Sequence, residues 1–127
     1  MWKEDLPKNC PPRKALEKDI QVYRILKSDA HQAEDFKNYL ALYPDNPRYK
    51  EICKAYALSF YDSVENAKLA LQKYTTLEGT HIGEYKLNKD HGVCNYADDS
   101  GHYSIWFYET WDFNTFTPIN ISSINEH

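Results

Sequence analysis

Five side chains able to bind or transform a ligand occur on segments with strand-like patterns: Arg24, Ser59, Glu84, His102 and Trp106. Arg24 is the one cation in the otherwise apolar IQVYRIL, and Glu84 is the lone anion in HIGEYKL. A guanidinium can grip a carboxylate or phosphate through two parallel hydrogen bonds, and carboxylates and imidazoles move protons. If the strands line one cleft, Arg24, Ser59 and Trp106 are candidate ligand-binding residues, and Glu84 and His102 are candidate catalytic residues. The alternative is a structural ion pair, or two charges on a solvated face.

The stretch GHYSIWFYETWDF, residues 101–113, is dense in aromatic rings. Because alternate side chains of a strand face opposite ways, one face carries Tyr103, Ile105 and Phe107. The other face carries His102, Ser104, Trp106 and Tyr108. The first set is a plain core face, whereas the mixed second set predicts the wall of a cleft, with Tyr108 as a further ligand-binding ring. Replacing Trp106 with alanine should therefore destabilise the protein less than replacing Ile105 with aspartate, which would place an unpaired carboxylate in the core.

Other common site chemistries are poorly matched by the sequence. His91 and Cys94 are three residues apart, with His81 and His102 on nearby strands, yet the paired Cys-x-x-Cys spacing of structural zinc sites is absent, so we expect no metal. Cys94 lies between apolar neighbours in a predicted strand, which favours a buried thiol over a nucleophile. Four glycines in all allow neither a phosphate-binding loop nor a dinucleotide fingerprint.

Residues 57–106 contain ALSFYDSVENAKLALQKY, GTHIGEYKL and GHYSIW, in that order. This order resembles a pattern of small uncharacterised bacterial proteins and is loosely similar to small ADP-ribosyltransferase-like domains. The resemblance implies that Arg24 holds a dinucleotide phosphate, that Ser59 supports the site and that Glu84 orients the ribose of NAD, which would be the substrate. The chain departs from the pattern at Ala57 and Tyr103, where glycine and histidine are expected, and it has no Ser-Thr-Ser triplet.

Charge and composition exclude several classes of protein. Residues 1–54 carry eleven basic and nine acidic side chains, and residues 55–127 carry four and ten, for a net charge of −4. The aromatic half therefore lacks the clustered cations that nucleic-acid binding requires. No apolar run approaches the length of a membrane span, and the start shows no secretory signal. Three cysteines, an odd number without tight spacing, do not form a disulfide framework. We therefore predict a reduced, cytoplasmic protein that binds neither nucleic acid nor membrane.

The hydrophobic period changes along the chain. A short helix is predicted over 13–18 and a strand over 20–26. Three further helices are predicted over 29–43, 49–56 and 62–74. Capping boxes at Asp29 and Asp62 mark the starts of the helices over 29–43 and 62–74. Strands are predicted over 57–61, 80–87, 93–97 and 102–109, with tight turns between the last three. The tail from about residue 118 is expected to be frayed. This pattern predicts a single α+β domain, residues 1–127, with an antiparallel sheet packed against N-terminal helices.

These features favour an accessory or interaction protein that binds a protein or small ligand through an aromatic-lined cleft, without a cofactor. Two alternatives stay open: an ADP-ribosyltransferase-like enzyme acting on NAD, and a small hydrolase using His102. Eleven tyrosines and three tryptophans are an excess typical of interfaces. A homodimer is therefore also expected.

Overall fold

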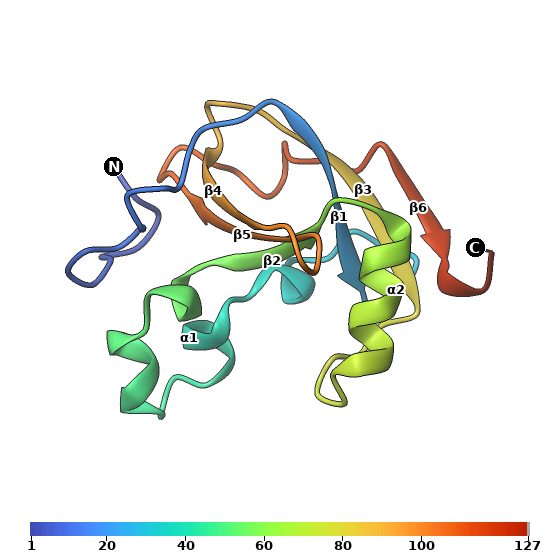
Figure 1. Cartoon of the computed structure of the whole chain (residues 1–127), viewed down its shortest axis with the longest axis horizontal. Helices are drawn as coiled ribbons and strands as arrows, with labels where there is room; N and C mark the ends of the chain where they lie inside the picture. Colours follow the sequence, from blue (N-terminus) through green and yellow to red (C-terminus); the bar gives the residue numbers. More distant parts are fainter. Residues whose placement is uncertain (127) are drawn as a thin grey trace.

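The computed structural model describes residues 1–126, and within them six strands form one antiparallel sheet (Figure 1). The strands are β1 (Ile20–Leu26), β2 (Leu58–Tyr61), β3 (His81–Leu87), β4 (Gly92–Ala97), β5 (His102–Phe107) and β6 (Asn120–Ser123). Their order across the sheet is β4-β5-β2-β1-β3-β6. The five strands predicted over 20–26, 57–61, 80–87, 93–97 and 102–109 are confirmed to within two residues at each end.

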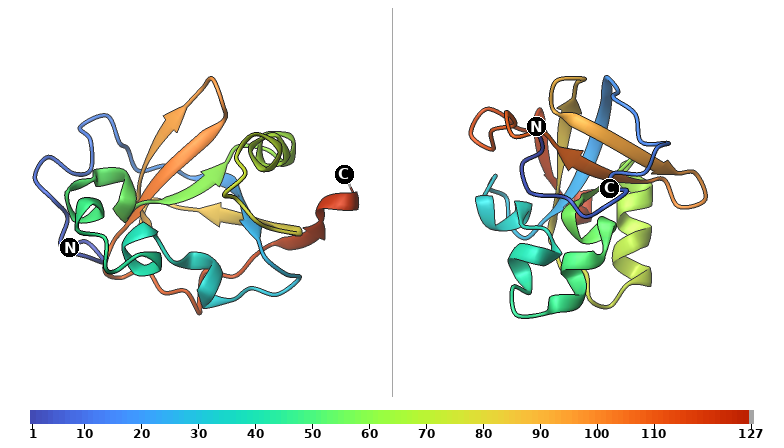
Figure 2. Two further views of the ribbon diagram at one scale, coloured as in Figure 1. Left: turned by 90° about the horizontal axis from the view of Figure 1, so that it is seen from below. Right: turned by 90° about the vertical axis from the view of Figure 1, so that its left-hand side faces the viewer.

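The sheet curls strongly, as the path of the chain from β3 to β4 requires. These strands follow one another after the short segment 88–91, yet three other strands separate them in the sheet. The predicted hairpin between them is therefore wrong, whereas the hairpin between β4 and β5 is confirmed by six consecutive residue pairs. A short connection can join strands so far apart in the sheet only when the sheet bends round on itself, which encloses one face as a core (Figure 2).

The helices are shorter and fewer than the periodicity predicts. The one helix longer than a turn among residues 1–126 is α2 (Val64–Lys73). Its N-cap is Ser63, which accepts a hydrogen bond from the Asn66 backbone N–H, and not the predicted Asp62. The predicted helix over 29–43 is instead a 3-10 turn η1 (Ala33–Phe36) and one α-helical turn α1 (Tyr39–Leu42). The helix predicted over 49–56 is replaced by two 3-10 turns, η2 (Pro47–Glu51) and η3 (Cys53–Tyr56).

The N-terminal helix predicted over 13–18 is absent. Leu16 instead exchanges two backbone hydrogen bonds with Cys94, at 2.9 and 2.8 Å, and so forms a β-bridge to the outer strand β4. The molecule is thus a mixed α and β fold, in which an antiparallel sheet is accompanied by α2 and short helical turns. Helix α2 packs on one face of the sheet, against Tyr61 and Ile82, whereas η1 contributes Phe36 to the cluster on the other face; Figure 1 shows α2 beside β1 and α1 below β2.

Each face of the sheet has its own hydrophobic cluster. Tyr103, Ile105 and Phe107 belong to the larger cluster inside the curl, so their assignment to the core face is confirmed. Phe36, Trp111 and Phe116 from outside the sheet close this cluster with a set of ring contacts. The smaller cluster, beneath α2, is made by Tyr61, Ala67, Ala70 and Ile82.

The C-terminal segment forms part of the sheet. Residues 120–123 are strand β6, which pairs with β3 from His81↔Ser123 to Glu84↔Asn120. The expectation of a frayed tail from about residue 118 is therefore wrong for residues 120–123. The pattern NISS is too short and too polar to signal a strand by itself, and pairing with the neighbouring strand β3 supplies the stabilisation.

The prediction of a fully reduced chain is also wrong. Cys10 and Cys53 form a disulfide across 43 residues of sequence, while Cys94 is a buried free thiol. An odd number of cysteines does not prevent one pair from bonding, and spacing alone could not show which two meet. The disulfide ties the N-terminal segment to η3.

A count of free thiols tests this pairing. The protein, denatured without reductant and with alkylation to block exchange, is expected to present one thiol, that of Cys94. Mass mapping should then recover a peptide joined through Cys10 and Cys53. Three free thiols in protein purified under oxidising conditions would contradict the disulfide.

Candidate functional site

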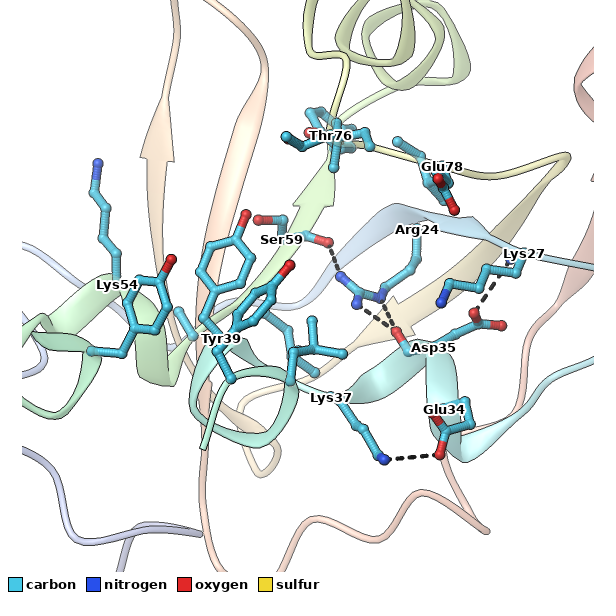
Figure 3. Close-up of a pocket in the computed structure, with 18 residues that line it drawn as sticks. Arg24, Lys27, Glu34, Asp35, Lys37, Tyr39, Lys54, Ser59, Thr76 and Glu78 are labelled. Carbon is cyan, nitrogen blue, oxygen red and sulfur yellow. Dashed lines mark hydrogen bonds and ion pairs between the residues drawn. The ribbon is translucent and has the colours of Figure 1, made fainter. Parts of the chain in front are cut away.

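Arg24 lies where strands β1 and β2 separate. The two strands pair only through Tyr23↔Tyr61 within the described chain, whereas β1 and β3 pair along seven residues. Beyond Tyr23 the Arg24 side chain occupies the gap, and its Nη1 donates to the Ser59 carbonyl at 2.6 Å (Figure 3). A side chain therefore makes the bridge between β1 and β2 at the place where a longer ladder would use backbone groups.

The Arg24 guanidinium is held by neutral acceptors. Nε donates to the Asp35 carbonyl at 3.0 Å, and Nη2 donates to the same oxygen. The rings of Phe36 and Phe60 lie 5.3 and 5.4 Å from its central carbon. Burial lowers the pKa of Arg24 to about 10, against a smaller opposing effect of Asp35, so the group stays charged at neutral pH. A guanidinium has five N–H donors, and three of them have partners among residues 1–126, which leaves two for a ligand.

Asp35 is a buried acidic residue beside this cation. Its side chain is only 6% exposed, and Oδ1 accepts a hydrogen bond from the Lys27 backbone N–H at 3.3 Å. Oδ2 is buried without a hydrogen-bond partner in the described part of the chain. Because Asp35 makes no ion pair with Arg24, the guanidinium keeps donors that a direct pair would consume.

A cavity of about 470 Å³ opens beside Arg24, between the short helical turns on one side and the segment 76–78 on the other. Tyr39, Tyr43 and Tyr49 line it, with ring centroids 5.7–6.1 Å apart. Tyr39 is 48% exposed and Tyr43 is 51% exposed, so their rings are available for contact. We call this cavity, with its three tyrosines and Arg24, the tyrosine groove.

The charge of the tyrosine groove is opposite in sign to that of the whole protein. Its lining includes four basic side chains, Arg24, Lys27, Lys37 and Lys54, against three acidic ones, Glu34, Asp35 and Glu78. Lys37 is paired with Glu34 at 2.8 Å, but Lys27 and Lys54 make no ion pair among the residues described. In a chain of net charge −4, this local excess of cations favours an anionic ligand.

The structure brings three of the predicted site residues together. Arg24 and Ser59 both line the tyrosine groove. His102, on the neighbouring strand β5, reaches the same serine: its Nε2 lies 2.9 Å from Ser59 Oγ. Burial lowers the pKa of His102, and the nearby cations Lys54 and Arg24 lower it further, so the imidazole is neutral at pH 7.

Glu84 does not join them. It is the partner of Tyr23 in the ladder between β1 and β3, whereas Arg24 is opposite Gly83. Because neighbouring positions of a strand point to opposite faces, the Glu84 and Arg24 side chains lie on opposite faces of the sheet. The predicted convergence of this cation and this carboxylate in one cleft is therefore wrong, and so is the alternative of a direct ion pair between them.

Trp106 is not a cleft wall. Its side chain is 1% exposed, and its indole N–H donates to the Cys53 carbonyl of η3 at 3.1 Å. The segment that the disulfide ties down covers this end of the mixed face, which the sequence pattern could not show. Tyr108 lies away from the groove, where its hydroxyl donates to Glu17 at 2.6 Å and its ring packs on Trp2.

Metal ligands do not gather in the described structure. Among residues 1–126 no three histidine, cysteine, aspartate or glutamate side chains are placed to hold a metal ion. His91 Nδ1 accepts a hydrogen bond from the Asn88 backbone N–H in the turn before β4. Burial raises the pKa of the Cys94 thiol, which makes it a weak nucleophile.

The tyrosines of the groove were not predicted as site residues from the sequence. Tyr43 and Tyr49 have helical spacing to apolar neighbours, so the pattern placed them on buried helix faces. Pro44 and Pro47 break those helices into single turns, which leaves the rings at the surface. The useful signal was the density of tyrosine around two prolines, a composition that short turns can expose.

A scan against protein-family models and searches among curated proteins and solved structures each found no significant match to the chain. The similarity to ADP-ribosyltransferase-like domains therefore stays a hypothesis. No helix within residues 1–126 has the length and apolar character needed to cross a bilayer.

Proposed function

We propose that the protein is a binding module whose tyrosine groove holds a small ligand with a flat ring and an anionic group. The observation that carries this proposal is the half-buried Arg24, with two unused donors, in the lining of a cavity that also holds half-exposed tyrosines. Arginine binds carboxylates and phosphates through paired charge-assisted hydrogen bonds. Tyrosine rings supply a large contact area at a small entropic cost. The cavity volume is within the usual range for small-molecule sites.

Calorimetric titration with benzoate and benzamide tests this proposal, because the two probes share a ring and differ in charge. Benzoate is expected to bind with a binding free energy of about 3–5 kcal/mol, which corresponds to a Kd near 1 mM and is usual for a ligand of this size. Benzamide should bind at least about tenfold more weakly, since a hydrogen bond to a charged group is worth about 1.5–3 kcal/mol.

A pair of matched tyrosine variants tests whether benzoate binds in the tyrosine groove. Tyr43→Leu should weaken benzoate binding, whereas Tyr74→Leu should not, because Tyr74 is equally exposed, at 49%, but lies outside the groove lining. Equal affinity for the two probes, or equal effects of the two variants, would contradict binding in the groove. A protein partner would be indicated if neither probe binds.

A transferase acting on NAD is the second candidate. Arg24 and Ser59 lie together as that reading requires, and a dinucleotide offers both flat rings and phosphates. Glu84, which would orient the ribose, is not among the residues that line the groove. NAD is therefore a third ligand to test in the same titration. If the Glu84→Gln variant still turns over NAD, Glu84 has no part in the mechanism.

Location and assembly are also proposals. The disulfide favours an oxidising compartment over the cytoplasm that the sequence predicted, because thiols of cytosolic proteins are kept reduced. Exposed apolar side chains around the groove, Leu42 at 42% and Ile52 at 41%, support the proposed homodimer. The binding function itself requires no cofactor.

A further inference from the structure

Ser59 and His102 form a contact that ligand binding alone does not explain. Ser59 is an exposed residue of β2 that lines the tyrosine groove, and its hydroxyl is 2.9 Å from His102 Nε2 on β5. The two residues are diagonal neighbours on one face, since Ser59 is opposite Ser104 and Tyr61 is opposite His102. The contact therefore sits on two paired strands, which hold its geometry rigidly.

His102 is set up as a neutral base in this position. The Tyr61 ring meets the imidazole edge-on, with centroids 5.4 Å apart, and limits its rotation. Its charged neighbours, Lys54 from η3 and Arg24 from β1, are cations that disfavour protonation of the ring. No carboxylate hydrogen-bonds to the imidazole among residues 1–126. When Nδ1 carries the proton, Ser59 donates to Nε2, as a serine–base pair requires.

Cations lie on both sides of the serine. In Figure 3 Ser59 lies between Lys54 and Arg24, and the Arg24 Nη1 is 2.6 Å from the carbonyl of Ser59 itself. The Arg24 guanidinium bonds the backbone carbonyl of Ser59, while the Ser59 hydroxyl contacts His102. A negative charge that develops on a carbonyl oxygen during attack by Ser59 would lie in the field of these two cations, which favours a tetrahedral intermediate.

We propose that Ser59 and His102 form a catalytic dyad that cleaves aryl esters in the tyrosine groove. The inference rests on the proposed function only in using the same groove: the aryl ring lies among the tyrosines and the acyl group meets Ser59. This activity goes beyond binding and names a nucleophile, a base and a substrate class.

The reaction needs no cofactor. Ser59 Oγ attacks the acyl carbon while its proton moves to His102 Nε2, and the bond from the acyl carbon to the aryl oxygen breaks as that oxygen takes the proton. Water then attacks the acyl carbon, His102 accepts and returns a proton, and the bond to Ser59 Oγ breaks. The products are a phenol and a carboxylic acid.

The test is acylation by 4-nitrophenyl acetate, followed by nitrophenol release and by intact mass with peptide mapping. Wild-type protein is expected to release nitrophenol in a burst and to carry one acetyl group on Ser59. His102→Gln should slow this acetylation at least about 100-fold, the usual contribution of a general base. Ser104→Ala is the matched control and should leave it unchanged, because Ser104 is buried and makes no hydrogen bond to a basic side chain among residues 1–126.

The pH dependence separates a base from a structural residue. Acetylation of Ser59 should fall as the pH drops below about 6.5, the ordinary histidine value, because His102, whose pKa is lowered, is protonated only there. Acetyl groups on lysines alone, or a Ser59 adduct that forms equally fast in His102→Gln, would overturn the dyad. Benzoate titration of the wild-type protein is read separately: binding without acetylation of Ser59 would overturn the dyad alone, whereas acetylation of Ser59 without benzoate binding would overturn the binding proposal alone.

Discussion

Arg24→Met is expected to lower the free energy of unfolding by about 3–6 kcal/mol, because two hydrogen bonds from a charged group to the Asp35 carbonyl are lost at about 1.5–3 kcal/mol each. Methionine keeps an apolar stem between Phe36 and Phe60 but leaves a buried carbonyl without a donor. The same change should abolish benzoate binding. Urea denaturation monitored by tryptophan fluorescence measures the stability.

Arg24→Lys is the control for charge. It keeps a cation in the gap between β1 and β2 but cannot reproduce the three directed bonds of the guanidinium. We expect it to be more stable than Arg24→Met and to bind benzoate more weakly than the wild type. A loss of less than about 1 kcal/mol for Arg24→Met, below the range for one charged hydrogen bond, would mean that the guanidinium is not bonded as described.

Trp106→Ala is expected to lower the free energy of unfolding by about 3–5 kcal/mol, the usual range for removing a large aromatic side chain from a core. This reverses the expectation from the sequence, which placed the indole on a cleft wall. The reason is the cover that η3 provides, with the indole N–H bonded to the Cys53 carbonyl. Urea denaturation again gives the loss.

Two variants separate the volume of the ring from its hydrogen bond. Trp106→Phe should lose about 1–3 kcal/mol, mainly through the Cys53 carbonyl that it leaves without a donor. Trp2→Ala removes a ring of the same type that is only half-buried against Tyr108, and it should be milder than Trp106→Ala. Equal losses for Trp106→Ala and Trp2→Ala would place the Trp106 ring at the surface.

The strands could be predicted because the alternation of apolar and polar side chains along a strand is kept when the strand packs into a sheet. The segment 20–26 is a strand with the predicted bounds, and alternation assigned Tyr103 and Phe107 to the correct face. What alternation cannot supply is register. Arg24 and Glu84 are on adjacent strands, but a shift of one residue decides whether two side chains share a face, and Arg24 is opposite Gly83.

More helix was predicted than the structure contains, because a hydrophobic period of 3.6 residues does not show where capping side chains start and end a helix. Asn38 accepts a hydrogen bond from the Ala41 backbone N–H, and Asn46 accepts one from the Arg48 backbone N–H. These side chains, with Pro44 and Pro47, start and stop the chain within single turns. The groove depends on this interruption, since continuous helices would have buried Tyr43 and Tyr49.

The site was found only in part for the same reasons. Arg24, Ser59 and His102 could be selected by residue type, because a charge or a histidine in a strand is unusual. The contact of Arg24 with the Ser59 carbonyl depends on the gap between β1 and β2, and the contact of Ser59 with His102 depends on the register of β2 and β5. No local pattern indicates either. Asp35 was not selected, because it lies within the helix predicted over 29–43, where an acidic residue gives no signal of burial.

The most direct test of ligand binding at Arg24 is a titration of its side-chain Nε–H resonance in the NMR spectrum of ¹⁵N-labelled protein, with assignment from Arg24→Lys. The spectrum contains only three arginines, Arg13, Arg24 and Arg48, so the signal can be followed alone. Benzoate at millimolar concentration should shift the Arg24 signal in a saturable way, and benzamide should leave it in place. A saturable shift of Arg13 or Arg48 with an unmoved Arg24 signal would contradict the proposal that this guanidinium anchors an anionic ligand in the tyrosine groove.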